Sequence, residues 1–336
     1  MDAPIPRNWF MNNKRDISLL VVVHTEEEFD WNKPFSSENA GVTHVPGLRR
    51  VQDVFDRHGV KATWMLGYPI VSNEESAAVF RDFVAQSGVE IGCHIHPWVT
   101  PPIDPAYDPS ESYHGNHPRD LEYAKIKTCT EAIKEKIGIQ PLSFLGGRYS
   151  FGPNTGAILE ELGYQVDMSI KATGYYAMDG GPDYRRVSLK AHWNSPGNGL
   201  LRIPGTGAYL GPLRFLGPWL SPLMAPKLVK QLRAEGILSH AGLFETLQLS
   251  PEGYSLKDMI KLTDAVIKQG EETLLLGFHS PSVMRNGTPY VKTHEDVEEF
   301  IDKIDQYLSY VTALGGVVPR TASDYRAYFV AGESRL

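Results

Sequence analysis

Apolar runs of strand length alternate with amphipathic stretches of helical length along most of the sequence. The strand-like runs cover residues 16–24, 60–66, 89–96, 142–145, 164–168, 200–203, 273–278 and 317–318. Helical periodicity covers residues 48–58, 74–86, 119–137, 154–162, 255–268, 294–314 and 322–329. Strand–helix pairs of about 30 residues predict parallel βαβ units and hence an α/β fold. About seven such strands favour a closed or nearly closed barrel over an open sheet, although spacing alone does not decide between them.

One stretch interrupts this alternation. Residues 179–239 are rich in glycine and proline, and we expect them to form an irregular insertion. We expect a single domain over residues 1–336, with a polar N-terminal tail at residues 1–15. Within the insertion, residues 205–226 are apolar. They either pack over the barrel or form a lid, a contact in a homo-oligomer or a surface for a lipid-linked substrate.

Composition and charge exclude several classes of protein. The net charge of −7 leaves no basic field to hold nucleic acid or an anionic membrane. The two cysteines, Cys93 and Cys129, do not provide a disulfide framework. No apolar run near the N-terminus is long enough to span a bilayer or to act as a signal segment. We therefore expect no transmembrane segment and a cytoplasmic location.

Histidines and a carboxylate stand where predicted strands end. His24 and Glu26 follow the first strand and share one face, because residues two apart in a strand point the same way. His94 and His96 end the strand at 89–96 in the same manner, and His279 follows the strand at 273–278. Each alone has a simpler explanation, such as a rim histidine or a solvated acid. Because the carboxyl ends of parallel strands meet at one edge, together they indicate one site.

The residue types point to hydrolysis with a metal ion. Glu26, His94 and His96 form a set of two imidazoles and one carboxylate, which is typical of a hydrolytic zinc site. We expect a divalent metal, with cobalt, nickel or iron as alternatives to zinc. His279 could protonate a leaving group, and Arg148, after the strand at 142–145, could orient a base or steady an oxyanion. The implied reaction is hydrolysis of an amide or ester.

Taken in order, these motifs resemble a known family. They are residues 21–31 (VVVHTEEEFDW), 90–98 (EIGCHIHPW) with 100–102 (TPP), 147–152 (GRYSFG), 181–183 (GPD), and 277–282 (GFHSPS) with 288–290 (TPY). The chain resembles the polysaccharide deacetylases of carbohydrate esterase family four, the NodB-homology group, and most of all its WalW-like branch. The resemblance covers roughly residues 16–330. It implies a distorted (β/α)7 barrel and metal-dependent removal of an acetyl group from an N-acetylated sugar.

The resemblance also implies roles for individual residues. By position, Glu26 matches the carboxylate metal ligand and His94 the first metal histidine. Arg148 matches the arginine that tethers the catalytic base, and His279 matches the general acid. His24 stands where the family has an aspartate base, so it is either the base or a metal ligand.

The second metal histidine usually lies four residues after the first, where this chain has Trp98. His96, His114 and His117 are the candidates to replace it. For the substrate we expect contacts from aromatic and acidic residues beside the motifs, namely Trp31, Trp98, Tyr149 and Asp183, with Asp30 and His117 as additional site residues.

Three functions remain open at this point. The first is a metal-dependent hydrolase that removes an acyl group from an amino sugar or glycan precursor, in the assembly of a bacterial surface polysaccharide. The second is an amidase that acts on a small non-sugar amide. The third is a catalytically impaired relative that binds a glycan or a protein partner, for which His24 at the aspartate position is the main argument.

Overall fold

The computed structural model describes residues 16–103, 109–197, 199–224 and 243–333. The strands are β1 (Ile17–Thr25), β2 (Thr63–Leu66), β3 (Glu90–Ile95), β4 (Ser143–Gly146), β5 (Val166–Asp167), β6 (His192–Trp193), β7 (Leu201–Arg202), β8 (Gly207–Leu210), β9 (Glu245–Gln248), β10 (Thr273–His279) and β11 (Val317–Pro319). The α-helices are α2 (Leu48–Arg57), α3 (Tyr68–Ser72), α4 (Glu74–Ser87), α5 (Arg119–Ile137), α6 (Thr155–Glu161), α7 (Gly217–Met224), α10 (Leu256–Lys268), α11 (His294–Thr312) and α12 (Ala322–Glu333). The expected N-terminal tail at residues 1–15 lies outside the described residues.

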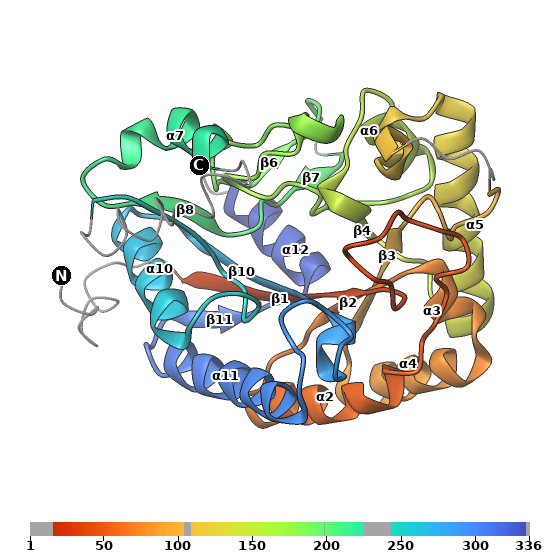
Figure 1. Cartoon of the computed structure of the whole chain (residues 1–336), viewed down its shortest axis with the longest axis horizontal. Helices are drawn as coiled ribbons and strands as arrows, with labels where there is room; N and C mark the ends of the chain where they lie inside the picture. The colour runs from red at the N-terminus through yellow and green to blue at the C-terminus, as the bar shows by residue number, and fades with distance from the viewer. Residues whose placement is uncertain (1–15, 104–108, 198, 225–242, 334–336) are drawn as a thin grey trace.

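Seven neighbouring strands run parallel in the order β10-β1-β2-β3-β4-β5-β7. β6 adds to β7 in the antiparallel direction, and β11 pairs with the first residues of β1. Among the described strands, β6 and β10 at the two ends of this order do not pair with each other, so the sheet curls without closing (Figure 1). The prediction of an α/β fold with a distorted, nearly closed (β/α)7 barrel is confirmed.

The two faces of the sheet have different cores. On β1, Leu19, Val21 and Val23 point outward and pack against the surrounding helices, including α2 and α11. The alternate residues Leu20 and Val22 point inward and pack with Tyr325 of α12. Figure 1 shows α12 on the opposite side of β1 from α2 and α11. The inner face is therefore apolar at the start of β1. The residues that continue this face toward the end of the strand lead into the site.

Helix positions agree closely with the sequence periodicity. The helix predicted at residues 119–137 coincides with α5. α10 and α11 begin with capping boxes, in which Ser255 and Thr293 pair with the acidic side chain three residues later. No helix in the described part of the chain combines the length and the apolar character needed to cross a membrane.

Residues 179–239 are more regular than a simple insertion. β6 and β7 belong to the main sheet, and β8 pairs with β9 in a separate antiparallel sheet. α7 follows β8, and residues 225–239 lie outside the described residues. β7 lies within the strand predicted at residues 200–203, whereas β6 has only two residues and too little pattern to be recognised. The two members of the β8–β9 pair lie far apart along the chain.

Candidate active site

The row of inward-pointing residues on β1 ends in the site. His24 follows Leu20 and Val22 on the inner face, and Glu26 continues the row just beyond the strand. On β3, His94 precedes the end of the strand and His96 follows it. Although β2 lies between β1 and β3, ligand atoms of Glu26, His94 and His96 all lie within 4.8 Å of one another. The structure thus brings together the three predicted metal ligands.

A glycine directly after the intervening strand packs closely against the backbone of β1. Thr25 of β1 is level with Leu66 of β2, and Leu66 is level with Cys93 of β3. The next residues along the three strands are Glu26, Gly67 and His94. Gly67 donates a backbone hydrogen bond of 2.8 Å to Thr25 O, and a Cβ on Gly67 would lie 3.3 Å from that oxygen and 3.7 Å from Glu26 Cα. Gly67 was missed from the sequence because a glycine directly after a strand also fits an ordinary turn.

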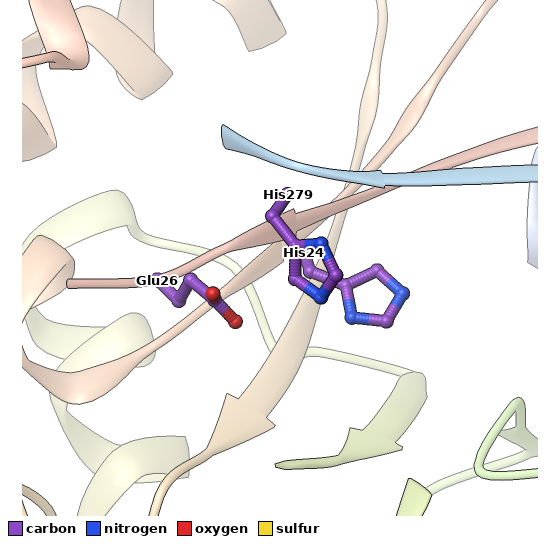
Figure 2. A group of neighbouring side chains, drawn as sticks. All are labelled: His24, Glu26 and His279. Carbon is purple, nitrogen blue, oxygen red and sulfur yellow. The ribbon is translucent and has the colours of Figure 1, made fainter. Parts of the chain in front are cut away.

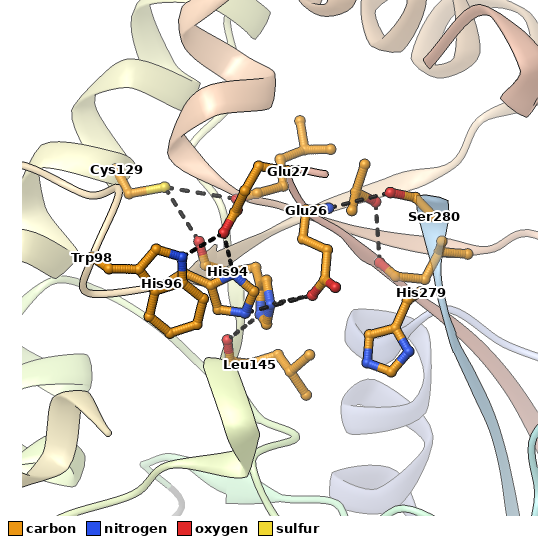
Figure 3. A network of polar contacts seen from close by, with 12 residues as sticks. Glu26, Glu27, His94, His96, Trp98, Cys129, Leu145, His279 and Ser280 are labelled. Atoms are coloured by element: carbon orange, nitrogen blue, oxygen red, sulfur yellow. Dashed lines mark hydrogen bonds and ion pairs between the residues drawn. The ribbon is translucent and has the colours of Figure 1, made fainter. Parts of the chain in front are cut away.

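Hydrogen bonds fix the orientation of both histidines. His94 Nδ1 lies 2.8 Å from Leu145 O, and His96 Nδ1 lies 2.8 Å from Glu27 Oε1. Since both partners are acceptors, each Nδ1 carries the proton and each Nε2 keeps a free lone pair. Figure 3 shows both rings turned toward the Glu26 carboxylate, whose Oε2 lies 3.4 Å from His94 Nε2 and 3.5 Å from His96 Nε2.

These atoms suit a divalent metal ion. Glu26 Oε1 and His94 Nε2 are buried and make no hydrogen bond within the part of the chain that the structure describes. Burial raises the pKa of Glu26, but His279, His96 and His94 outweigh it, so the pKa lies below its usual value and the carboxylate is charged. Two neutral imidazole nitrogens and one carboxylate oxygen are a common donor set for catalytic zinc.

Glu27 and Trp98 contact the His96 ring and fix its position. Glu27 Oε1 accepts hydrogen bonds from both His96 Nδ1 and Trp98 Nε1, at 2.8 and 2.9 Å. Burial and the neighbouring Glu26 raise the pKa of Glu27 to about 8. The Trp98 ring stacks on His96 with 4.1 Å between centroids and is only 2% exposed. The Trp98 side chain thus packs against His96 and holds it in place, and a contact between Trp98 and substrate stays a prediction.

His24 and His279 form the other half of the site. They are level on the neighbouring strands β1 and β10, with ring centroids 4.8 Å apart. Figure 2 shows the Glu26 carboxylate pointing toward this pair, and ligand atoms of all three also lie within 4.8 Å of one another. His279 Nδ1 lies 2.7 Å from Glu252 Oε2, so its proton points to Glu252 and Nε2 is free.

The two histidines differ in basicity. Burial and the neighbouring His279 lower the pKa of His24 well below its usual value. Burial also lowers the pKa of His279, but the carboxylates of Glu252 and Glu26 outweigh it, and the pKa is raised. One imidazole is therefore kept neutral, as a base must be before it takes up a proton, and the other holds a proton more readily.

A cavity of about 100 Å³ opens beside these histidines. Its lining includes His24, His279, Tyr149, Lys171 and Tyr290, together with apolar residues of the inner face. Tyr149 lies edge-on to His24, with ring centroids 5.4 Å apart. Trp31 lies edge-on to His279 at 4.8 Å. Tyr149 and Trp31 therefore stand where the sequence analysis expects substrate contacts.

Arg148 lies near the site, but its partners differ from those expected. Its guanidinium pairs with Asp179 and Ser112 and lies over the Tyr113 ring, 4.1 Å from the centroid. The structure therefore ties Arg148 to Asp179 and not to His24. Arg148 and Tyr149 have φ angles of 54° and 57°, a left-handed conformation that non-glycine residues rarely adopt. Two strained residues in succession turn Tyr149 toward the cavity.

Neither His114 nor His117 joins the metal ligands. His114 is fully buried, with Nδ1 3.0 Å from Glu122 Oε1 and Nε2 3.0 Å from Ser150 O. His117 Nε2 lies 2.8 Å from Glu111 O. His96 lies two residues after His94 and so keeps the same direction, and of the three candidates it is the one whose ring nitrogen faces Glu26, at 3.5 Å.

The two predicted acidic site residues also lie elsewhere. Asp30 is exposed and accepts hydrogen bonds from Asn32. Asp183 pairs with Arg185 through both carboxylate oxygens. Each forms a local turn contact, which a sequence motif alone does not distinguish from a site residue.

One hydrogen-bonded chain has the order of a serine-hydrolase triad. Ser280 Oγ lies 2.8 Å from His44 Nε2, and His44 Nδ1 lies 2.9 Å from Glu28 Oε1. However, Ser280 is completely buried and its Oγ accepts the backbone N–H of Glu26 at 3.2 Å. The serine is buried away from any substrate, so these hydrogen bonds fix the backbone at Glu26.

Comparison with known proteins identifies solved structures with a similar fold. No family model and no curated protein matches the sequence. A protein described as a polysaccharide deacetylase from Mycobacterium smegmatis has a similar structure, with a TM-score of 0.53, 16% identity and coverage of 99% of this chain and 95% of that one. The PuuE allantoinase and a protein described as a polysaccharide deacetylase from Pseudomonas aeruginosa PAO1 each give a TM-score of 0.55, 17% identity and coverage of 98% and 95%.

These likenesses define a fold class. The chain has the α/β fold of the polysaccharide deacetylases, over nearly its whole length and theirs. The same fold also carries an allantoinase, so fold alone does not fix the substrate. Membership of the WalW-like branch stays a prediction.

Proposed function

We propose that this chain is a metal-dependent hydrolase that removes an acyl group from the nitrogen of an amino sugar or glycan precursor. The single observation that carries the proposal is the orientation of His94 and His96. Both Nδ1 atoms are bound to acceptors, and both Nε2 atoms face the same carboxylate oxygen of Glu26. Histidines that serve only packing do not need two free lone pairs directed at one buried charge.

The residues divide into ligands and proton carriers. Glu26, His94 and His96 would hold the ion. A bound divalent ion polarises the acyl carbonyl and makes the attacking water more acidic. His24 receives the proton of that water, because its environment keeps the ring neutral. His279 delivers a proton from Nε2 to the leaving nitrogen, with Glu252 holding the opposite side of the ring.

Metal analysis followed by an activity assay tests this proposal. The purified chain is expected to bind one equivalent of zinc, cobalt or nickel, and Glu26→Gln and His94→Ala to bind none. The metal-loaded chain should release acetate from N-acetylhexosamines. His192→Gln is a matched control, since this histidine is exposed and far from the donor set in the chain. A chain that binds no divalent metal, or one that binds it and cleaves no amide or ester, would contradict the proposal.

A second candidate is an amidase that acts on a small non-sugar amide. The small cavity beside His24 and His279 favours it, because a volume of about 100 Å³ holds a short acyl or ureido group. Cleavage of ureides without cleavage of acetylated sugars would select this candidate. A role in assembly of a bacterial surface polysaccharide, a cytoplasmic location and a homo-oligomeric state all belong to the first proposal as expectations.

A further inference from the structure

The cavity beside His24 and His279 also contains a lysine that the proposed mechanism does not use. Lys171 follows β5, forms an isolated parallel bridge with Gly205, and lines the same cavity as both histidines. The side chain is partly buried, and its Nζ lies over the Tyr149 ring, 4.8 Å from the centroid. The cavity wall combines apolar residues, including Val22, Met168 and Leu275, with polar ones, including Thr206, Gln248 and Ser250.

The Lys171 ammonium has no acceptor. Among the residues that the structure describes, none lies within hydrogen-bonding or ion-pair distance of its Nζ. The carboxylate of Glu252 also lines the cavity, but it accepts the backbone N–H of His279 at 3.1 Å, His279 Nδ1 at 2.7 Å and Ser282 Oγ. An ammonium carries three N–H donors, and a ring face satisfies none of them fully.

Other lysines of this chain show what a structural lysine does. Lys125 Nζ donates to Pro97 O and Thr100 O, both at 2.8 Å. Lys303 Nζ donates in the same way to two backbone carbonyls, at 3.0 and 3.1 Å. Lys171 differs from both because its donors point into a cavity instead of toward the main chain. An anionic group of a ligand in the cavity would supply the acceptor that the described residues do not give to Lys171.

We infer that Lys171 binds an oxyanion of the substrate, so that the substrate is an N-acyl compound with a carboxylate a few bonds from the scissile amide. The inference depends on the proposed function for the position of the scissile amide. The position of the carboxylate follows from the cavity that Lys171 lines. The reacting carbonyl lies at the Glu26, His94 and His96 end, and the carboxylate reaches past His24 and His279 to Lys171. Within the proposed function, an N-acylated amino sugar that carries a carboxylate would pair with the ammonium, so it should bind more tightly than a neutral sugar.

Binding of small anions to the full-length chain tests this inference directly. The probes are malonamate, succinamate and glutaramate, each compared with the neutral diamide of the same length. Calorimetry in the presence of a chelator prevents the carboxylates from binding to metal. At least one monoanion should bind about 10-fold more tightly than its diamide, which corresponds to one charge-assisted hydrogen bond. The length that binds best reports the separation between the amide and carboxylate positions.

Three variants show whether Lys171 is responsible. Lys171→Met should abolish the preference for the anion, Lys171→Arg should keep part of it, and the exposed Lys257→Met should leave it unchanged. Circular dichroism and Tm establish that each variant is folded. Equal binding of anions and diamides by the wild-type chain, no binding of either, or a preference that survives in Lys171→Met would each overturn the inference.

A further variant separates this inference from the proposed function. Glu26→Gln should lose metal binding and hydrolysis but keep the preference for monoanions. If the wild-type chain shows no hydrolysis while the anion preference depends on Lys171, only the proposed function fails. If hydrolysis of neutral N-acetyl sugars proceeds and Lys171→Met leaves KM unchanged for acidic and neutral substrates alike, only the inference about Lys171 fails.

Discussion

His24 and His279 occupy paired positions on neighbouring strands, yet they have different partners. His279 has the Glu252 carboxylate at 2.7 Å, whereas ring contacts surround His24, namely His94, His279 and Tyr149. At the scale of single residues, function therefore depends on which imidazole has a carboxylate behind it. The sequence shows both histidines but not this difference, because Glu252 lies 27 residues before His279 in the chain.

Replacing His24 tests whether it works as a base. His24→Ala should lower kcat by about 100- to 10,000-fold, the usual contribution of a general base. His24→Asp should not exceed wild-type activity, because the side chains around position 24 suit a neutral ring and not a carboxylate. Acetate release under saturating substrate measures both variants. A large gain of activity in His24→Asp would instead identify the wild-type chain as a catalytically impaired member of the fold.

Replacing Glu252 tests the origin of the acidity of His279. Glu252→Gln removes the charge that raises the pKa of His279, so that pKa should fall. A general acid works only while protonated, so the fall in rate on the alkaline side should move to lower pH. NMR titration of the His279 ring in the metal-free chain measures the pKa, and a pH–rate profile measures the consequence. An unchanged pKa would show that Glu252 has only a structural role.

At the scale of elements, the site is assembled where strands end and short irregular segments begin. Helices with clear periodicity and strands with continuous apolar runs were predictable, because each repeats its pattern over several residues. The residues from Gly146 to Tyr149 were not, since their conformation depends on contacts with β3. A Cβ on Gly147 would lie 2.3 Å from His96 Cδ2 and 2.5 Å from Ile95 O. The loop after β4 is thus shaped to press against a metal ligand.

Gly147→Ala tests this contact. The added methyl group must displace either the His96 ring or the β3 backbone, at a cost of about 1–3 kcal/mol in the free energy of unfolding. The displacement of a ligand should also weaken metal binding, which competition with a chromogenic chelator measures. Gly332→Ala is the matched control, because no atom lies within 4 Å of the position that its Cβ would take. Equal metal affinity in the two variants would show that His96 tolerates the shift.

At the scale of the whole molecule, the sequence predicted that residues at the ends of β1 and β3 come together. It did not predict which residues from other segments line the cavity beside them. Glu26, His94 and His96 were found because strand parity and the common edge of a parallel sheet are visible in sequence. Lys171 and Glu252 were missed because they reach the cavity from irregular segments after β5 and β9. Trp98, Asp30, Asp183 and His117 were placed by their proximity to motifs, and this does not reveal whether a side chain faces the cavity.

Metal binding should stabilise the entire fold. The donor atoms come from β1 and β3 and the residues after them, so an ion held between them favours the folded chain over the unfolded one. At a free metal concentration about 1,000 times the Kd, the gain is about 4 kcal/mol. Scanning calorimetry with and without a chelator should show a lower Tm in the chelated chain, and Glu26→Gln should show no response to zinc. A Tm that does not depend on metal would argue against the assigned donor set.

The position of β1 has a consequence for how the protein is made. β1 (Ile17–Thr25) is hydrogen-bonded along one edge to β10 (Thr273–His279). Along its other edge it bonds to β11 (Val317–Pro319) at its first residues and to β2 at its last residues. A ribosome therefore releases the strand that bears His24 and Glu26 long before it releases the partners on one of its edges. Until then the nascent apolar strand keeps an open edge, so we expect it to need chaperone protection, and we expect N-terminal fragments that stop before residue 273 to aggregate.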